Sequence, residues 1–570
     1  MRSRRIEIAP GKWEDGPIRR LQQALAEQIG AVSGVVRNRD LRRLELAWGG
    51  FFAVEWGSLL GLSVWAYERG GASAVGVIGL LRMLPAALAL PFGSLVTDRF
   101  PRQRVLVFVY ALQGLLLGAV AAVIAADGPA AVTYLLVALV GVAAAPCRPA
   151  QLSLAPVFSR SPQELVAANV TQTTFEGLAT LLGPALAGVL LAVGDASVAL
   201  AASAAVSLAG ALLVAGLRTD ADPTRAARRD REPIPVALAG GVRELVRLPD
   251  VATIVGAFWA QTLVRGMLNV YVVTLALTTL GLGQAGVGFL SAMFGAGVML
   301  GALVATTLVG RRRLSRPFLL GLTLWGAPLV AIGVWPTLGV AVAALVVSGI
   351  GNAELDVSGF TLMQRLADDR VLGRVFGVMY VGILATVGIG SILAPLAIRG
   401  LGLRGAVAAS GALLPAVALV LYRRLTRVDE HSSVPEAELG LIRSVSLFEP
   451  LPPTSLEKLA RAAVWAHVPA GDDVVREGER GDTFYVVAEG SLVVTSDGSR
   501  LRDLTAGDFF GEIALLRDVA RTATVEARSD ATLLVVHRLD FLSAILGTLE
   551  SATSAEEIVS RRIDPVPVLR

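Results

Sequence analysis

The hydrophobic positions of the chain follow two different patterns. Between about residue 44 and residue 424, apolar residues form long stretches, each close to the roughly 20 residues that an α-helix needs to cross a bilayer. From Val468 to His537, apolar residues alternate with polar ones and are broken by glycine and aspartate, as in β-strands. The pattern therefore predicts a helical membrane body followed by a smaller domain that contains strands.

The apolar stretches predict about twelve transmembrane helices in two halves of about six, a layout typical of transporters built from repeated bundles. A charged linker between the halves includes a possible amphipathic helix from Pro235 to Leu248. The predicted spans are 45–67, 73–97, 104–126, 131–156, 165–193, 196–217, 251–279, 285–309, 316–335, 337–362, 375–398 and 405–424.

The same pattern sets the expected domain boundaries. They are 1–43 for a polar N-terminal segment, 44–217 and 251–424 for the two helical halves, 218–250 for the linker, 425–440 for a connector and 441–570 for the C-terminal domain. Residues 17–29 form either a short amphipathic helix on the membrane or a partly ordered tail. No short apolar core with a cleavage site follows the first arginines, so a cleaved signal peptide is not expected. Short helices are expected over 436–465, 539–549 and 555–562.

Composition agrees with a bilayer as the solvent for most of the chain, since 54% of residues are hydrophobic and 17% are charged. Arginines gather in alternate loops, so both ends of the body are expected in the cytoplasm. The only lysines are Lys12 and Lys458, a bias typical of a GC-rich bacterial genome, so we expect a bacterial plasma membrane. The net charge of +4 gives no indication of a nucleic-acid partner.

Two residue types limit the chemistry. The single cysteine, Cys147, excludes an internal disulfide. The three histidines all lie outside the predicted spans, which excludes proton coupling through an intramembrane histidine. The sequence has no metal-ligand cluster, no nucleophile–base arrangement and no GxxxxGK[ST] loop, so we expect neither an enzyme nor an ATP-driven pump, and neither a cofactor nor a metal.

The stretch FFGEIALLRDVARTATV, residues 509–525, has the composition of an anion pocket. Gly511 lacks a Cβ, so the backbone there can approach a ligand closely. Residues 512–517 can form a short helix whose first N–H groups suit a phosphate. Glu512 offers a carboxylate to a ribose hydroxyl, Arg521 supplies a fork of donors to a phosphate, and Thr522 adds a hydroxyl.

This stretch resembles the phosphate-binding cassette of cyclic-nucleotide-binding domains, and residues 476–490 are similar to the glycine-punctuated β-roll of that family, with turns at Gly478, Gly481 and Gly490. The alternative is a β-roll that has lost its ligand. The residues that the resemblance assigns to the nucleotide are Phe510, Gly511, Glu512, Ile513, Ala514, Arg521, Thr522 and Ala523. In the family, threonine at the position of Thr522 accompanies cGMP-selective kinase sites, whereas the bacterial context favours cAMP.

The loop between the second and third spans, residues 93–104, resembles the loop motif of the major facilitator superfamily, with Pro101 in place of the usual glycine. The resemblance implies a latch that closes the cytoplasmic side, and the alternative is a turn that carries positive-inside charge. The latch residues are Gly93, Asp98, Arg99, Arg102 and Arg104. The corresponding loop after the eighth span, residues 310–316, keeps its cations but lacks the aspartate.

The fifth span contains glycines and a proline that resemble the motif of exporting members of the superfamily: Gly177, Gly183, Pro184 and Gly188. Pro184 is expected to bend the helix, and the glycines are expected to let helices touch closely. Gly295, Gly297 and Gly301 of the eighth span form a plausible partner face. Residues 169–174 and 146–149 are similar to drug and siderophore exporters, so an exporter is favoured over an importer.

Charged residues inside the predicted spans are costly in a bilayer and normally face protein or water. The predicted cavity and coupling residues are Glu55, Arg148, Glu176, Arg265, Glu354 and Asp356, with Arg82 as a further candidate. Our hypothesis is that Glu55 and one of Glu354 or Asp356 take part in proton coupling or cation recognition. Internal ion pairs that hold the bundle together are an equal alternative, and Arg148, Glu354 and Asp356 are alternatively gating pairs.

The predicted fold is mainly α, a polytopic bundle of twelve transmembrane helices with a C-terminal α+β cyclic-nucleotide-binding β-roll. The predicted function is a secondary transporter of a small molecule, regulated by cAMP or cGMP. A membrane receptor or scaffold that does not transport is the alternative. A nucleotide-gated channel is disfavoured because the sequence has no TVGYG-like filter and no span with an arginine at every third position. The transported molecule and the oligomeric state do not follow from the sequence.

Overall fold

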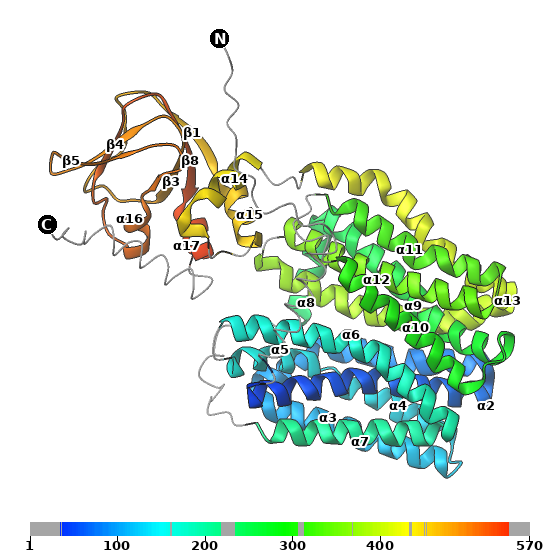
Figure 1. The fold of residues 1–570 in the computed structure, drawn as a ribbon. Coiled ribbons are helices and arrows are strands. Elements are labelled where there is room, and N and C mark those ends of the chain that lie inside the picture. The colour runs from blue at the N-terminus through cyan, green and yellow to red at the C-terminus, as the bar shows by residue number, and fades with distance from the viewer. Residues whose placement is uncertain are drawn as a thin grey trace. The chain divides into compact units, whose positions relative to one another are not determined.

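The computed structural model describes residues 35, 37–159, 162–217, 234–305, 313–367, 369–431, 436–449, 451 and 453–545 (Figure 1). The chain separates into two compact units, Met1–Ser432 and Ser433–Arg570, which we call the membrane unit and the C-terminal unit. The predicted helices over 17–29 and 555–562 lie outside the described residues.

The membrane unit is entirely helical where it is described, and ten of its helical segments are long and apolar enough to cross a membrane. The predicted amphipathic linker helix is confirmed as α8. The helices are α2 (Arg39–Arg99), α3 (Arg102–Ala125), α4 (Ala130–Ala144), α5 (Cys147–Phe158), α6 (Pro162–Val193), α7 (Ala196–Ala215), α8 (Ile234–Arg247), α9 (Pro249–Thr274) with the π-helical turn η2 (Leu275–Thr279), α10 (Gly283–Ala305), α11 (Ser315–Val334), α12 (Leu338–Leu366) and α13 (Asp369–His431).

Two of the long helices are interrupted by glycine. In α2 the backbone leaves the helical region at Gly70 and Gly71, where Gly71 has φ +59°, and in α13 it does so at Gly402, with φ +69°. Such positive φ values favour glycine because a Cβ would clash. Glu55 and Arg82 form an ion pair across the break in α2, so the two arms of α2 lie side by side. The count of twelve spans stays a prediction.

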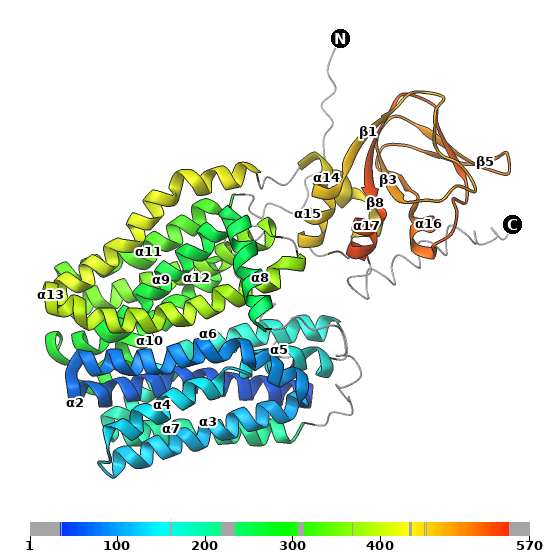
Figure 2. The same ribbon diagram turned by 180° about the vertical axis from the view of Figure 1, so that it is seen from behind.

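The two halves, α2–α7 and α9–α13, appear as adjacent bundles in Figures 1 and 2, and they meet where α6 packs on α10 and where α2 packs on α13. A Cβ added to Gly188 of α6 would lie 2.9 Å from the Cα of Gly288, so these two backbones touch. The predicted partner face is right for Gly295, which packs on Thr180 and Leu181 of α6. It is wrong for Gly297 and Gly301, which instead pack on α12 because they lie on another side of α10. Helix α6 continues through Pro184.

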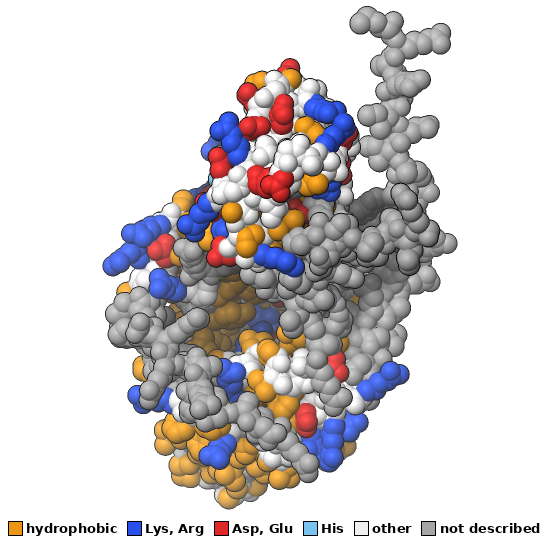
Figure 3. All heavy atoms as spheres, turned by 90° about the vertical axis from the view of Figure 1, so that its left-hand side faces the viewer, with side chains coloured by type: hydrophobic (Ala, Val, Ile, Leu, Met, Phe, Trp, Pro, Cys, Tyr) orange, Lys and Arg blue, Asp and Glu red, His pale blue; other side chains and the backbone are white. Residues whose placement is uncertain are grey.

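The two ends of the membrane unit differ in charge. The end at which α2 begins and α13 finishes carries many arginines, including Arg42, Arg102, Arg374 and Arg424, and Figure 3 shows blue side chains gathered there around hydrophobic ones. At the opposite end the two halves are joined by polar contacts. Arg399 donates to Ser73 Oγ at 3.1 Å, and Gln284 donates to Glu68.

The C-terminal unit consists of two antiparallel four-stranded sheets with short helices, as the alternating pattern predicts. The sheet orders are β1-β8-β3-β6 and β2-β7-β4-β5. The strands are β1 (Val464–Val468), β2 (Asp473–Val475), β3 (Thr483–Glu489), β4 (Leu492–Ser496), β5 (Ser499–Leu504), β6 (Phe509–Phe510), β7 (Thr524–Ala527) and β8 (Ala531–His537). The helices are α14 (Glu436–Ser444), the 3₁₀ turn η4 (Ser446–Phe448), α15 (Pro453–Ala462), α16 (Glu512–Arg517) and α17 (Arg538–Ile545).

Strand β3 shows how the alternation builds the core of the C-terminal unit. Phe484 and Val486 point to a cluster made with α14, α15 and α17, whereas Tyr485 and Val487 point to a second cluster between the sheets. Phe484 stacks on Phe541 of α17 with ring centroids 4.8 Å apart. Both faces of β3 are therefore covered, and the strand is a rigid support for the turn that follows its neighbour β6.

Candidate functional site

The turn from β6 into α16 is held in a conformation that requires glycine. Gly511 has φ +92° and caps α16, and a Cβ there would lie 2.9 Å from the carbonyl oxygen of Thr483. Phe510, just before it, pairs with Tyr485 in the sheet and stacks on its ring at 4.8 Å. The predicted short helix is confirmed as α16, and its first turn begins directly at Glu512.

Arg521 is buried beside this turn, with 6% of its surface exposed. Its guanidinium donates to the carbonyl oxygens of Gly511 at 3.1 Å and Thr483 at 2.7 Å. A Cβ on Gly481 would lie 2.6 Å from the guanidinium carbon, so Gly481 leaves the space that the side chain occupies. Burial lowers the pKa of Arg521, while the nearby Tyr485 and Glu512 act in the opposite direction. A buried cation of this kind gains from a bound anion.

Glu512 is 1% exposed at the N-terminus of α16, on the other side of Gly511 from β6. Ala514 is also buried, whereas Thr522 is exposed and Ile513 and Ala523 are partly exposed. The structure thus gathers Phe510, Gly511, Glu512, Ala514 and Arg521 around one turn. Their contact with a ligand stays a prediction.

Arg538 is a further residue of this region that the sequence analysis missed. It begins α17, and its guanidinium pairs with Asp518 at the end of α16 and lies 3.9 Å from Asp482. Its backbone N–H donates to the Asp482 carbonyl at 2.8 Å. Arg538 therefore links α16 to α17. The sequence did carry a signal for this residue, because Arg538 is a cation that directly follows a strand and precedes a helix. The predicted helix, 539–549, began one residue after it.

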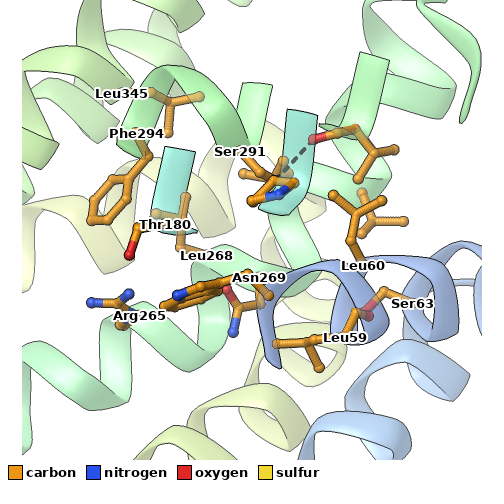
Figure 4. Close-up of a pocket in the computed structure, with 15 residues that line it drawn as sticks. Leu59, Leu60, Ser63, Thr180, Arg265, Leu268, Asn269, Ser291, Phe294 and Leu345 are labelled. Carbon is orange, nitrogen blue, oxygen red and sulfur yellow. Dashed lines mark hydrogen bonds between the residues drawn. The ribbon is translucent and has the colours of Figure 1, made fainter. Parts of the chain in front are cut away.

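A second candidate site is a pocket of about 660 Å³, part of it open to solvent, between the halves of the membrane unit (Figure 4). Helices of both halves line it, with Trp56 of α2 and Thr180 of α6 from the N-terminal half and Arg265 of α9 and Phe294 of α10 from the C-terminal half. The guanidinium carbon of Arg265 lies 4.8 Å from the Trp56 ring centroid and 5.3 Å from that of Phe294. The predicted cavity residue Arg265 thus lines a cavity.

Asp356 is connected to Arg265 through an amide. Arg265 donates to Asn352 Oδ1 at 3.2 Å, and Asn352 donates to Asp356 at 2.7 Å. Trp325 also donates to Asn352 Oδ1, at 3.1 Å, and fixes the orientation of that amide. Glu354, two positions from Asp356 on α12, is 7% exposed.

Glu55 lies in a polar cluster inside the N-terminal half. It accepts from Arg82 at 3.0 Å and from Gln113 at 2.8 Å, and Arg82 also donates to Ser58 Oγ at 3.0 Å. Arg82 is 2% exposed and Glu55 is 27% exposed. This geometry matches the internal ion pair that was the alternative to proton coupling, and the coupling role of Glu55 stays a proposal.

A third group of charges joins α2, α5 and α6. Arg148 lies 3.8 Å from Glu176, and Trp48 donates to the same carboxylate at 3.1 Å. Glu45 lies within electrostatic range of Glu176, is 0% exposed, and neither of its oxygens has a hydrogen-bond partner among the described residues. Glu45 was not among the predicted charged residues of the spans, since it is the first residue of the predicted span 45–67.

Comparison with known protein families decides the identity of the membrane unit. Residues 48–314 and, in an overlapping match, residues 254–470 fit the family model of the Major Facilitator Superfamily. The chain belongs to the major facilitator superfamily. Residues 465–547 match the cyclic nucleotide-binding domain, so this superfamily member carries such a domain after its multi-pass membrane body.

Three similar proteins match this superfamily member over 101 to 118 residues. A cAMP-dependent protein kinase regulatory subunit of Debaryomyces hansenii is 38% identical over 107 residues, 19% of this chain and 24% of that protein. A cyclic nucleotide-gated potassium channel of Mesorhizobium japonicum is 41% identical over 101 residues, 18% of this chain and 28% of that protein. Human cGMP-dependent protein kinase 2 is 35% identical over 118 residues, 20% of this chain and 15% of that protein. The chain spans less than a third of each.

Within the superfamily fold, the predicted latch residues lie at the arginine-rich end. Arg102 donates to the Ser153 carbonyl of α5 at 3.0 Å, and Arg99 and Arg104 are exposed. Gly93 packs against α4, since a Cβ there would lie 2.8 Å from the Ala145 carbonyl oxygen. The side chain of Asp98 and residues 310–312 of the corresponding loop lie outside the described part. The latch role stays a prediction.

The exporter-type motif contributes to the contact between the halves through Gly188. Gly188 touches Gly288, and Gly183 packs on α2, where a Cβ would lie 2.9 Å from the Ala53 carbonyl oxygen. Gly177 has more room, with Met299 as its nearest neighbour at 3.9 Å from the added Cβ. The motif therefore brings α6 against both halves, and the direction of transport stays a prediction.

Proposed function

We propose that this protein is a secondary active exporter of a small molecule whose activity is set by a cyclic nucleotide, with cAMP favoured over cGMP. The observation that supports this most is the buried Arg521 beside Gly511 and the N-terminus of α16, in a domain fused to a major facilitator bundle. The relatives named for cAMP and cGMP share this domain. Both termini of the bundle face the cytoplasm of a bacterium, because the arginine-rich end is the inner one.

The nucleotide acts by binding one conformation of the protein more tightly than another. Its phosphate accepts from Arg521 and from the first N–H groups of α16, and Glu512 accepts from the ribose. Arg538 carries the change to α17, because it is bound to the end of α16 and begins α17. A tenfold change in the ratio of two conformations requires about 1.4 kcal/mol.

Flux into inverted membrane vesicles from producing cells tests this proposal. The vesicles are given an acidic interior, with ethidium as a cationic probe and 2-naphthoate as an anionic probe. We expect uptake of at least one probe, and a change of twofold or more in its rate on addition of cAMP. Uptake that ignores cAMP contradicts the regulatory part. Absence of uptake in protein that binds cAMP contradicts the transport part and supports a receptor.

Gly511, in the turn between β6 and α16, provides a sharp test of the nucleotide site. Gly511→Ala is expected to weaken cAMP binding at least tenfold, because the Cβ would lie 2.7 Å from Arg521 Nη1 and displace the guanidinium. Gly507→Ala is the matched control, since Gly507 also has φ +92° but a Cβ there meets open space. Both variants lose about 1–2 kcal/mol of stability from the left-handed backbone. Isothermal titration of full-length protein measures the affinities, and equal affinities in the two variants contradict the site.

A substitution of Glu55 tests proton coupling most directly. Glu55→Gln removes the titratable group, while the amide oxygen still accepts from Arg82 and Gln113, so the protein should still be produced. Its thermal stability should fall, because the buried Arg82 loses its counter-charge. Uptake driven by the pH gradient is expected to disappear. Unchanged pH-driven uptake refutes the coupling role and leaves the ion pair as the function of Glu55.

A further inference from the structure

We infer that the pocket between the halves binds an amphipathic organic anion, with its anionic group on Arg265 and its apolar body against the leucines and valines of the lining. The inference rests on the proposed transport function, because it assigns the pocket to the substrate. It concerns the chemical class of that substrate, which the membrane fold alone leaves open.

Arg265 is a cation whose protein partners leave it able to bind an anion. It donates to the neutral amide oxygen of Asn352, and it is flanked by the rings of Trp56 and Phe294. Among the described residues, no carboxylate forms an ion pair with Arg265. The nearby Asp356 is separated from it by Asn352. A guanidinium has five N–H donors in a planar fork, so a carboxylate can still be bound by two parallel hydrogen bonds.

Most of the rest of the lining is apolar, with the amide of Asn269 as a polar exception. Leu59, Leu60, Leu268 and Val272 contribute apolar surface from α2 and α9. Two hydroxyls of the lining already donate hydrogen bonds within their own helices. Ser63 donates to the Leu59 carbonyl at 2.7 Å, and Ser291 donates to the Val287 carbonyl at 2.8 Å. Such a surface favours a ligand with few polar groups of its own.

Arg265, the one charged residue among the described residues that line the pocket, lies at one side of it. In Figure 4, Arg265 is there with Thr180, Leu268 and Phe294, and Leu59, Leu60 and Ser63 lie at the other side. A ligand with an anionic group at one end and a ring or chain at the other matches this arrangement. An organic cation is disfavoured, because its charge would be placed beside a guanidinium in a largely apolar surrounding.

A matched series of ring compounds tests the inference by equilibrium binding to full-length protein in lipid nanodiscs, without nucleotide and without a gradient. The probes are 2-naphthoate, 2-naphthamide and 2-naphthylmethylammonium, which share an apolar body and differ in charge. We expect wild-type protein to bind the anion most tightly and the cation least. Trp56→Phe, beside Arg265, should reduce the tryptophan fluorescence change on binding and so locate the probe in this pocket.

Arg265→Gln is expected to weaken 2-naphthoate binding roughly tenfold or more and to leave 2-naphthamide within about twofold, because the charge-assisted hydrogen bonds are lost. Arg265→Lys should be intermediate, since the lysine keeps the charge but lacks the fork. Arg69→Gln, which removes a surface arginine paired with Asp127, should leave all three affinities unchanged.

Three outcomes overturn the inference: no binding of 2-naphthoate to wild type, equal or tighter binding of the amide or cation, and an unchanged naphthoate affinity in Arg265→Gln. If Arg265→Gln does not fold, the order of the three probes on wild-type protein and the Arg265→Lys variant decide. Since the measurement needs neither flux nor cAMP, its failure is distinguishable from failure of the proposed function, which the vesicle experiment detects.

Discussion

Arg521→Gln is expected to lower the affinity of the full-length protein for cAMP by roughly a hundredfold, the combined effect of losing two charge-assisted hydrogen bonds to a phosphate. The expectation follows from the position of Arg521, which is buried and held by the carbonyl oxygens of Gly511 and Thr483. Isothermal titration with cAMP and cGMP measures the loss. Uptake by vesicles that contain this variant should no longer respond to cAMP while its basal rate is retained.

Two further variants separate the charge of Arg521 from its shape. Arg521→Lys keeps a cation but replaces the planar fork with a point charge, so we expect a loss smaller than that of the glutamine variant. Arg500→Gln is the matched control, because Arg500 is an exposed arginine of the same unit that pairs with Asp503 on β5. Wild-type affinity in Arg521→Gln would show that the phosphate is not bound at this position.

The nucleotide-binding turn was predictable because its parts are close in sequence. Gly511, Glu512 and Arg521 lie within eleven residues, and the strand, turn and short helix that hold them follow from local pattern and from glycine. The alternating pattern likewise predicted strands in this region, and the structure adds that both faces of β3 are covered. What the local pattern left out was the link to α17, since the contact of Arg538 with Asp518 spans twenty residues and depends on how the two helices meet.

The membrane unit was predictable in its elements and less so in its contacts. Hydropathy places a span to within a few residues, but it does not say which face of a helix meets which neighbour. Gly288 therefore escaped notice although it touches Gly188, and Gly297 and Gly301 were assigned to the wrong neighbour. Glu45 was not singled out, because its burial comes from other helices and not from its own surroundings in the sequence.

The ion pair between Arg82 and Glu55 leads to the prediction with the largest effect on stability. Arg82→Met is expected to destabilise the membrane unit by about 3–5 kcal/mol, because it leaves the carboxylate of Glu55 inside the bundle without its cation. The double variant Arg82→Met, Glu55→Gln should recover most of this loss, since neither charge then remains and Gln113 keeps a neutral partner. Unfolding in detergent, followed by tryptophan fluorescence, measures the midpoints.

An exposed ion pair serves as the reference for the loss of stability in this experiment. Arg69 and Asp127 form an ion pair at 2.8 Å with 34% and 89% of their side chains exposed, so Arg69→Met should cost less than about 1 kcal/mol. If Arg82→Met costs no more than Arg69→Met, the buried pair does not hold the bundle together, and the coupling role of Glu55 gains support. If Arg82→Met is severely destabilised and the double variant does not recover stability, the loss has another cause than the unpaired carboxylate of Glu55. It then comes from packing around Arg82 and from its hydrogen bond to Ser58.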